Sequence, residues 1–200
     1  MSQAGSNESD AAAESTQALL RRAGDGDGQA LDVLARRYLG PLRRFARGRL
    51  PAWARDAMET DDLVQETLLK TLRRAEHFEA EHTGAFHGYL RTAVLNQIRD
   101  ELRRVSRRPL VGGSAGSISD PAPSPLEEAI GKEALERYER ALAELDPLER
   151  EAIHGRIELG LPWALVAESL GKPSPDAARM IVSRAVARLA RAMSDEPRPG

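Results

Sequence analysis

A stretch without any regular hydrophobic pattern divides this chain into two parts, and it limits the possible folds more than any other feature. Residues 106–125 read SRRPLVGGSAGSISDPAPSP, a run rich in glycine, serine and proline. Such a composition is typical of a flexible linker and not of a packed element. We therefore expect two small domains, at residues 15–107 and 126–194, joined by a linker at 108–125.

Both parts have the spacing of amphipathic helices. Apolar side chains recur every three or four residues, and no segment alternates apolar and polar residues as a half-buried strand does. Asp27 and Thr60 are the expected caps of two of these helices, and Pro41 is expected to kink or break the first of them. Residues 1–14 are small and polar and are expected to be a disordered tail. The predicted fold is all-α, with helices at residues 15–24, from 28, 60–74, 84–107, 126–144, 147–159, 162–170 and 175–193.

Composition excludes several classes of protein. There is no cysteine, which rules out disulfides and thiolate metal sites and agrees with a cytoplasmic location. His77, His82, His87 and His154 have no metal-ligand spacing, and we expect them to be solvated surface groups. No run approaches the roughly 18 apolar residues of a membrane span, and the first residues do not resemble a secretory signal. We expect neither membrane insertion, nor a cofactor, nor an enzymatic site.

Positive charge is concentrated in two places, although the net charge of the chain is −2. Residues 29–108 hold 16 Lys and Arg against 11 Asp and Glu. Residues 172–191 hold five basic side chains and a single acidic one, Asp176. Local basic surfaces of this kind favour contact with nucleic acid, whatever the net charge.

The expected helix at 84–107 separates its side chains into two faces. Leu90, Val94 and Ile98 belong to an apolar stripe that continues at Leu102 and Val105. The opposite face carries Thr92, Asn96, Arg99, Arg103 and Arg107. Arginines there can meet phosphates, the Asn96 amide can meet a base edge, and the rings of Phe86 and Tyr89 can stack on unpaired bases. A merely solvated arginine face is the alternative interpretation.

Residues 161–193, LPWALVAESLGKPSPDAARMIVSRAVARLARAM, have the layout of a helix-turn-helix. Gly171 can end the first helix in a left-handed conformation, and Ser174 can cap the second, which starts at Pro175. Ala178, Val182, Ala185 and Leu189 form the inner side of that second helix. Arg179, Ser183 and Arg184 are directed outward or to the flank, where they can reach DNA. An ordinary helical hairpin is the alternative here.

Both parts together resemble the extracytoplasmic-function (ECF) group of the sigma-70 family. DDLVQETLLKTLRR at residues 61–74 is similar to the most characteristic segment of that family, and GAFHGYLRTAVLNQIRDELRR to the helix that melts and reads the −10 element. LDPLEREAIHGRIELGLPWALVAESLGKPSPDAARMIVSRAVARL is similar to the domain that reads the −35 element. The resemblance covers residues 15–193 in the family's order.

The resemblance implies a role for each matching residue. Asp62, Gln65 and Glu66 match the segment that docks on the β′ clamp helices of core RNA polymerase. The residues that match the −10 region are Phe86, Tyr89, Asn96, Arg99, Arg103 and Arg104. The residues that match the −35 recognition helix are Ser174, Arg179, Ser183 and Arg184. Promoter DNA and core polymerase are the implied partners, and an anti-sigma factor is a further one.

Two other functions remain open from the sequence. A stand-alone helix-turn-helix regulator would bind duplex DNA without polymerase and would have no need of the DDLVQETLLK segment. A helical adaptor that binds only protein would keep its activity when Arg99 or Arg184 is replaced by alanine.

Overall fold

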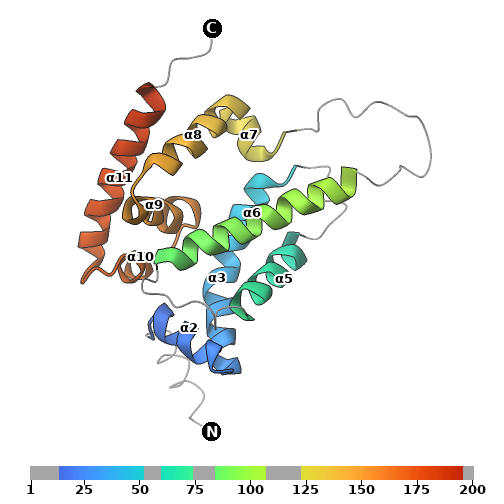
Figure 1. Ribbon diagram of the computed structural model, residues 1–200, viewed down its shortest axis with the longest axis vertical. Coiled ribbons are helices and arrows are strands. Elements are labelled where there is room, and N and C mark those ends of the chain that lie inside the picture. Colours follow the sequence, from blue (N-terminus) through green and yellow to red (C-terminus); the bar gives the residue numbers. More distant parts are fainter. Residues whose placement is uncertain (1–13, 52–59, 74–83, 107–122, 196–200) are drawn as a thin grey trace, which may run out of the picture.

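The computed structural model describes residues 14–51, 60–73, 84–106 and 123–195, and every regular element in these ranges is a helix. The N-terminal half, up to residue 106, contains α2 (Thr16–Gly24), α3 (Gly28–Arg49), α5 (Thr60–Arg73) and α6 (Gly84–Ser106). The C-terminal half, from residue 123, contains α7 (Pro125–Ile130), α8 (Lys132–Glu144), α9 (Pro147–Ile153), a π-helical turn η2 (His154–Glu158), α10 (Trp163–Ser169) and α11 (Pro175–Asp195). The predicted all-α fold is confirmed (Figure 1).

Short-range hydrogen bonds determine where several helices begin. The Asp27 carboxylate accepts the N–H groups of Gln29 and Ala30 at 2.8 and 3.3 Å, as expected for the cap of α3. Ser174 accepts the N–H of Ala177 at 3.2 Å at the start of α11, so this predicted cap is also confirmed. These caps satisfy N–H groups that have no partner within their own helix.

The helices differ from the predicted pattern at three places, and only at Gly131 is a predicted helix divided in two. Helix α3 continues through Pro41, because Tyr38, Leu42 and Phe45 on either side are buried and their packing outweighs the lost hydrogen bond. The helix expected at 126–144 is divided at Gly131, whose φ of +83° is outside the helical range. The helix expected at 147–159 changes to the wider π-helical pattern at His154.

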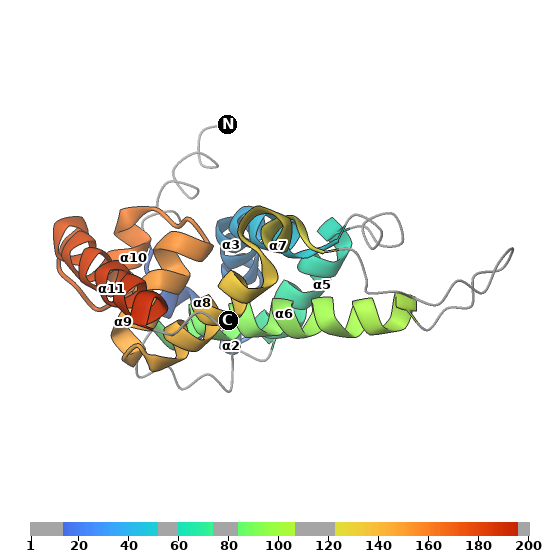
Figure 2. The same ribbon diagram turned by 90° about the horizontal axis from the view of Figure 1, so that it is seen from above.

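Helix α3 is the centre of the N-terminal half and packs against α2, α5 and α6. Its buried residues recur every three or four positions, so that one face is continuously apolar. Helix α6 lies across α3 and α5, and its first turns meet α9 and η2 (Figures 1 and 2). The far end of α6 therefore points away from α11.

The two halves share buried contacts. One apolar cluster contains Leu34 and Leu68 from the N-terminal half together with Ala152, Val166 and Val182 from the C-terminal half. A second cluster joins α8, α9 and α11 through Leu142, Ile153 and Leu189. The predicted linker up to residue 122, the predicted tail up to residue 13, and His77, His82 and Arg107 lie outside the described residues, and the division into two domains stays a prediction.

Candidate functional site

Helix α6 presents an arginine-bearing face that is anchored by a buried stripe. Leu90, Val94 and Ile98 are buried, as the periodicity predicted. Four polar side chains among the predicted site residues are exposed on this helix: Asn96, Arg99, Arg103 and Arg104. Arg99 donates to the Asn96 side-chain oxygen at 3.1 Å, and Arg104 pairs with Glu101 three residues earlier. Exposed pairs of this type are weak, so a phosphate can compete for these arginines.

The two aromatic candidates on α6 differ in accessibility. Phe86 is fully buried, and its ring packs edge-on against Tyr38 with 5.2 Å between centroids. In this arrangement Phe86 offers no face to a base, contrary to the expectation that it could stack. Its spacing from Leu90 and Val94, four and eight residues, places it on the buried stripe. Tyr89 is 36 % exposed and can still present its ring.

The first turns of α5 form an acidic and polar surface. Asp62, Gln65 and Glu66 are all exposed, whereas Leu63 and Val64 between them are buried. Glu66 pairs with Lys70 at 2.7 Å. These carboxylates lie in and just after the first turn of α5, where the helix dipole stabilises negative charge. The three predicted residues thus share one accessible face.

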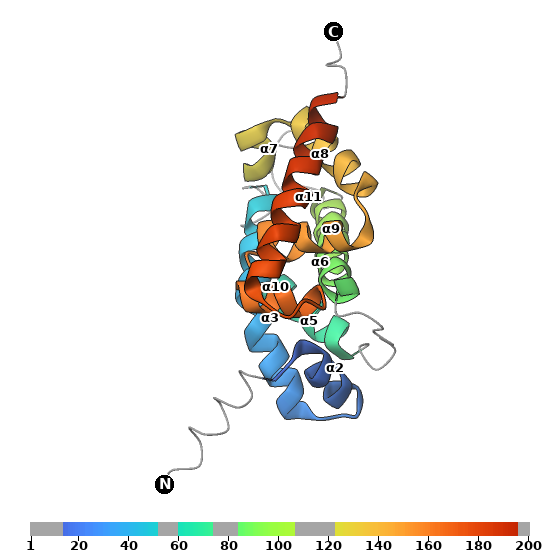
Figure 3. The ribbon, with the colours of Figure 1, turned by 90° about the vertical axis from the view of Figure 1, so that its left-hand side faces the viewer.

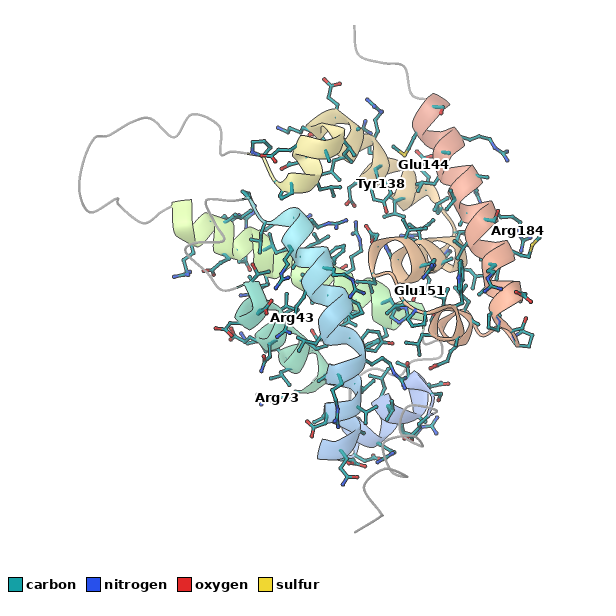
Figure 4. The ribbon with its side chains drawn as sticks, turned by 180° about the vertical axis from the view of Figure 1, so that it is seen from behind. Arg43, Arg73, Tyr138, Glu144, Glu151 and Arg184 are labelled. Carbon is teal, nitrogen blue, oxygen red and sulfur yellow. The ribbon has the colours of Figure 1, made fainter. Side chains whose placement is uncertain are left out.

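The helix-turn-helix is formed by α10 and α11. Gly171 has a φ of +61°, which confirms its predicted left-handed conformation between the two helices. Arg179, Ser183 and Arg184 are exposed, while Ala178, Val182 and Ala185 are buried. Helix α11 lies along the outside of the C-terminal half (Figure 3), and Arg184 points away from the molecule (Figure 4). Ser174 differs from the others because its hydroxyl serves as the cap.

A buried polar junction connects the two halves, and we did not expect it from the sequence. Its first part is a chain of contacts from α3 to α9. Arg37 donates to the Thr16 hydroxyl at 2.8 Å, which lies 3.2 Å from the Tyr38 hydroxyl. Tyr38 is hydrogen-bonded to Nε2 of His87 at 2.9 Å, and Nδ1 of His87 lies 2.5 Å from Glu151. The prediction that His87 is a solvated surface group was therefore wrong.

The second part of the junction surrounds Glu158, whose side chain is 3 % exposed. Its carboxylate accepts from Arg91 at 2.6 Å and from Arg49 at 3.1 Å, both in the N-terminal half, and contacts His154 Nδ1 at 2.8 Å. Arg91 also makes a two-pronged contact with Glu139 at 2.6 and 2.8 Å. His154 is buried too, so its predicted surface position was wrong.

The two buried carboxylates of the junction titrate in opposite directions. Burial raises the pKa of Glu151, and the contact with His87 offsets this only in part. Burial alone would raise the pKa of Glu158 as well. Hydrogen bonds and charges from His154 and Arg91 instead lower the pKa of Glu158 to about 2. Glu158 is therefore held as a carboxylate by its partners on both sides of the junction.

Glycines allow the close approach at this junction. A Cβ at Gly155 would lie 3.4 Å from the His87 ring, and a Cβ at Gly88 would lie 3.6 Å from the His154 ring. Each ring thus fills the space beside a glycine of the opposite half.

The described helices include none long and apolar enough to cross a bilayer.

Comparisons with known proteins give consistent relatives. Residues 34–108 match the family model described as Sigma-70 region 2. The chain is 32 % identical over 190 residues to the ECF RNA polymerase sigma factor ShbA of Streptomyces griseus, covering 90 % of this chain and 95 % of that protein. It is 28 % identical over 160 residues to the ECF RNA polymerase sigma factor SigC of Mycobacterium tuberculosis, covering 80 % and 82 %. A solved structure of CnrH in complex with the cytosolic domain of CnrY is similar at 23 % identity and a TM-score of 0.40, covering 92 % of this chain and 100 % of that one.

Proposed function

Because the chain belongs to the ECF group of the sigma-70 family, we propose that its three exposed polar faces divide the work of a sigma factor among them. A sigma factor binds core RNA polymerase and directs it to promoters for transcription initiation, and this chain has that function. What remains to be assigned is which residues make each contact. The exposed residues of α5, α6 and α11 are the candidates.

The face of α5 is proposed to bind the β′ clamp helices of the polymerase. Asp62, Gln65 and Glu66 are exposed together and supply two carboxylates and one amide. A stand-alone regulator would have no use for such a surface beside its DNA-binding helices. The similarity to ECF sigma factors over most of the chain also favours a polymerase subunit over that alternative and over a protein-binding adaptor.

The face of α6 is proposed to read and open the −10 element. The observation that carries this assignment is the exposed row from Asn96 to Arg104, opposite a stripe whose Leu90, Val94 and Ile98 are buried in the core. Unstacking a base step costs a few kcal/mol, and each base captured on an aromatic ring returns about 1–3 kcal/mol. Of the two aromatic residues predicted to stack on bases, Phe86 is buried, and Tyr89 has the accessible ring. No nucleophile, metal ion or nucleotide is required from this chain, which would act in the cytoplasm.

The face of α11 is proposed to read the −35 element with Arg179, Ser183 and Arg184. Helices α6 and α11 both pack against α9, so their axes are at most roughly 20 Å apart at that point. Two DNA elements centred about 25 base pairs apart are separated by roughly 85 Å. If the full length of α6, roughly 35 Å, is added to the spacing of the two axes, the total is still well below the separation of the two DNA elements. The proposal therefore requires the two halves to separate when both elements are bound.

Transcription in vitro with purified core polymerase and a pool of duplexes with randomised promoter sequence tests the assignment. The wild-type chain should select promoters with two conserved elements. Arg99→Ala should weaken selection at the −10 element and Arg184→Ala at the −35 element, each by about 1–3 kcal/mol if a base contact is lost. Arg21→Ala, an exposed arginine on α2, is the matched control and should leave selection unchanged.

Failure would be evident in two ways. If the chain does not bind core polymerase and gives no promoter-dependent transcript, the assignment of all three faces is wrong. If transcription occurs but Asp62→Ala with Glu66→Ala binds core polymerase as tightly as wild type, only the role of α5 is wrong.

A further inference from the structure

The ring of Trp163 holds two arginines at the entrance to the helix-turn-helix. The guanidinium carbon of Arg156, on η2, lies 4.4 Å from the ring centroid, and that of Arg179, on α11, lies 5.3 Å from it. Trp163 is the first residue of α10 and is partly buried against the apolar core. Trp163 thus connects α11, the second helix of the motif, to η2, the segment that precedes the motif.

Both guanidinium groups have a second contact that fixes their direction. Arg179 pairs with Asp176, one turn earlier on α11. Arg156 donates to the backbone carbonyl of Leu161 at 2.9 Å, in the loop that leads into α10. The side chain of Arg179 is still 53 % exposed. An exposed arginine ordinarily samples many rotamers, so contacts on two sides restrict it before any ligand arrives.

Two positive charges lie close together beside the Trp163 ring. The two guanidinium carbons are no more than about 10 Å apart, since both lie close to the same ring. This is about one Debye length at 0.1 M salt, so the two positive charges still repel each other. The ring attracts both cations, and a phosphate or a base edge would relieve their repulsion further. The Asp176 carboxylate neutralises part of this charge, and the half-exposed Arg179 guanidinium remains accessible to such a ligand.

We propose that Trp163 is a positioning residue for promoter recognition, which holds Arg179 in the direction of the major groove and Arg156 beside it as a phosphate contact. This inference rests on the proposed role of α11 at the −35 element. Arg179 belongs to the second turn of α11, and the first turns of a recognition helix are those that reach base edges. Arg156 precedes the motif, and we assign it to the adjacent phosphate backbone, where a contact adds affinity without sequence preference.

The test uses the complete chain bound to core polymerase and a promoter selected from the randomised pool. Arg179→Ala should reduce discrimination at one −35 position about 5- to 150-fold. Trp163→Leu, which keeps an apolar side chain but removes the ring, should reduce the same discrimination about two- to fivefold, and Trp163→Phe should reduce it less. Arg156→Ala should leave discrimination unchanged and lower the slope of log affinity against log salt concentration by about 1.

A double-mutant cycle separates positioning from a merely structural role. If Trp163 acts through Arg179, Trp163→Leu should have no further effect on discrimination in an Arg179→Ala background. A structural defect would instead weaken binding to all sequences equally in both backgrounds and lower the melting temperature. Unchanged discrimination in folded Trp163→Leu, or independent effects of the two substitutions, would overturn the inference. Should Trp163→Leu fail to fold, the same cycle is run with Trp163→Phe. A partial loss of discrimination that disappears in the Arg179→Ala background supports the inference, and unchanged discrimination contradicts it. If the wild-type chain itself gives no transcript, the proposed function has failed and not this inference alone.

Discussion

At the scale of single residues, the two glutamates of the junction form a natural matched pair. Glu151 and Glu158 are both buried and both contact a histidine, yet the pKa of Glu151 is raised by burial and the pKa of Glu158 is lowered to about 2. A lowered pKa means that the charged form stabilises the fold, and a raised pKa means that the charged form destabilises it. The two side chains should therefore respond in opposite ways to the loss of their charge.

We expect Glu158→Gln to lower the free energy of unfolding at pH 7 by on the order of 3 kcal/mol. The contribution of Glu158 is complete above its unfolded pKa, near 4.5, and is lost as the pH falls towards about 2. The difference between wild type and Glu158→Gln should therefore shrink across this window in urea titrations. Glu151→Gln is the control, and it should cost little at pH 7 because burial already favours its uncharged form. Equal losses for the two variants at pH 7 would contradict this account.

The exposed residues of α6 and α11 could be predicted from the sequence, and the junction could not. The inward and outward sides of both helices follow from a period of 3.6 residues, and the caps follow from local hydrogen bonding. The spacing of His87 and Arg91 does indicate their burial, because they lie seven and three residues before Val94 on the buried stripe. Their partners Glu151 and Glu158 are distant in sequence, and nothing local specifies that pairing.

At the scale of the elements, the turn between α10 and α11 depends on the backbone of Gly171. Its φ is +61°, and a Cβ at this position would have nothing within 4 Å. The left-handed conformation costs a residue with a side chain roughly 1–2 kcal/mol. Any loss on substitution here is therefore a backbone effect, separate from steric conflict.

We expect Gly171→Ala to lower the free energy of unfolding by roughly 1–2 kcal/mol and Gly171→Asn by less, since asparagine tolerates this conformation better. Gly48→Ala is the matched control near the end of α3, where an added Cβ also has nothing within 4 Å and φ is not positive. It should stabilise by up to about 1 kcal/mol, because alanine favours helix over glycine. Urea denaturation of the three variants measures both signs. A stability loss in Gly48→Ala as large as in Gly171→Ala would show that φ is not the cause.

Helix continuity was less predictable than helix position. The helix is not broken at Pro41, and the segment expected at 147–159 is helical but π-helical from His154. Buried neighbours retain α3 across Pro41, and the turn at η2 places His154 and Glu158 together in the junction. Local sequence signals describe what a segment favours by itself, whereas these two features depend on what the segment packs against. The division at Gly131 is a local effect of its φ of +83°.

At the scale of the whole molecule, the shared core and the junction hold the two proposed DNA-binding faces closer together than the −10 and −35 elements of a promoter lie. The apolar cluster and the ion pairs of Arg91 with Glu158 and Glu139 both cross between the halves. Burial of such pairs contributes little net stability, but removing one partner is costly. The chain is thus expected to hold this arrangement until polymerase and DNA supply competing contacts.

A reversible cross-link tests whether the halves must separate. The Gly88 backbone and the His154 side chain face each other across the junction, with 3.6 Å between a built Cβ and the ring. Because the chain has no cysteine, Gly88→Cys with His154→Cys can form only one disulfide. We expect the oxidised double variant to remain folded and to give no promoter-dependent transcript. The same sample should regain transcription after reduction.

Each single variant is a control for the substitution and for the oxidant, and neither should respond to reduction. Transcription by the oxidised form equal to that of the reduced form would show that both elements can be read without separation.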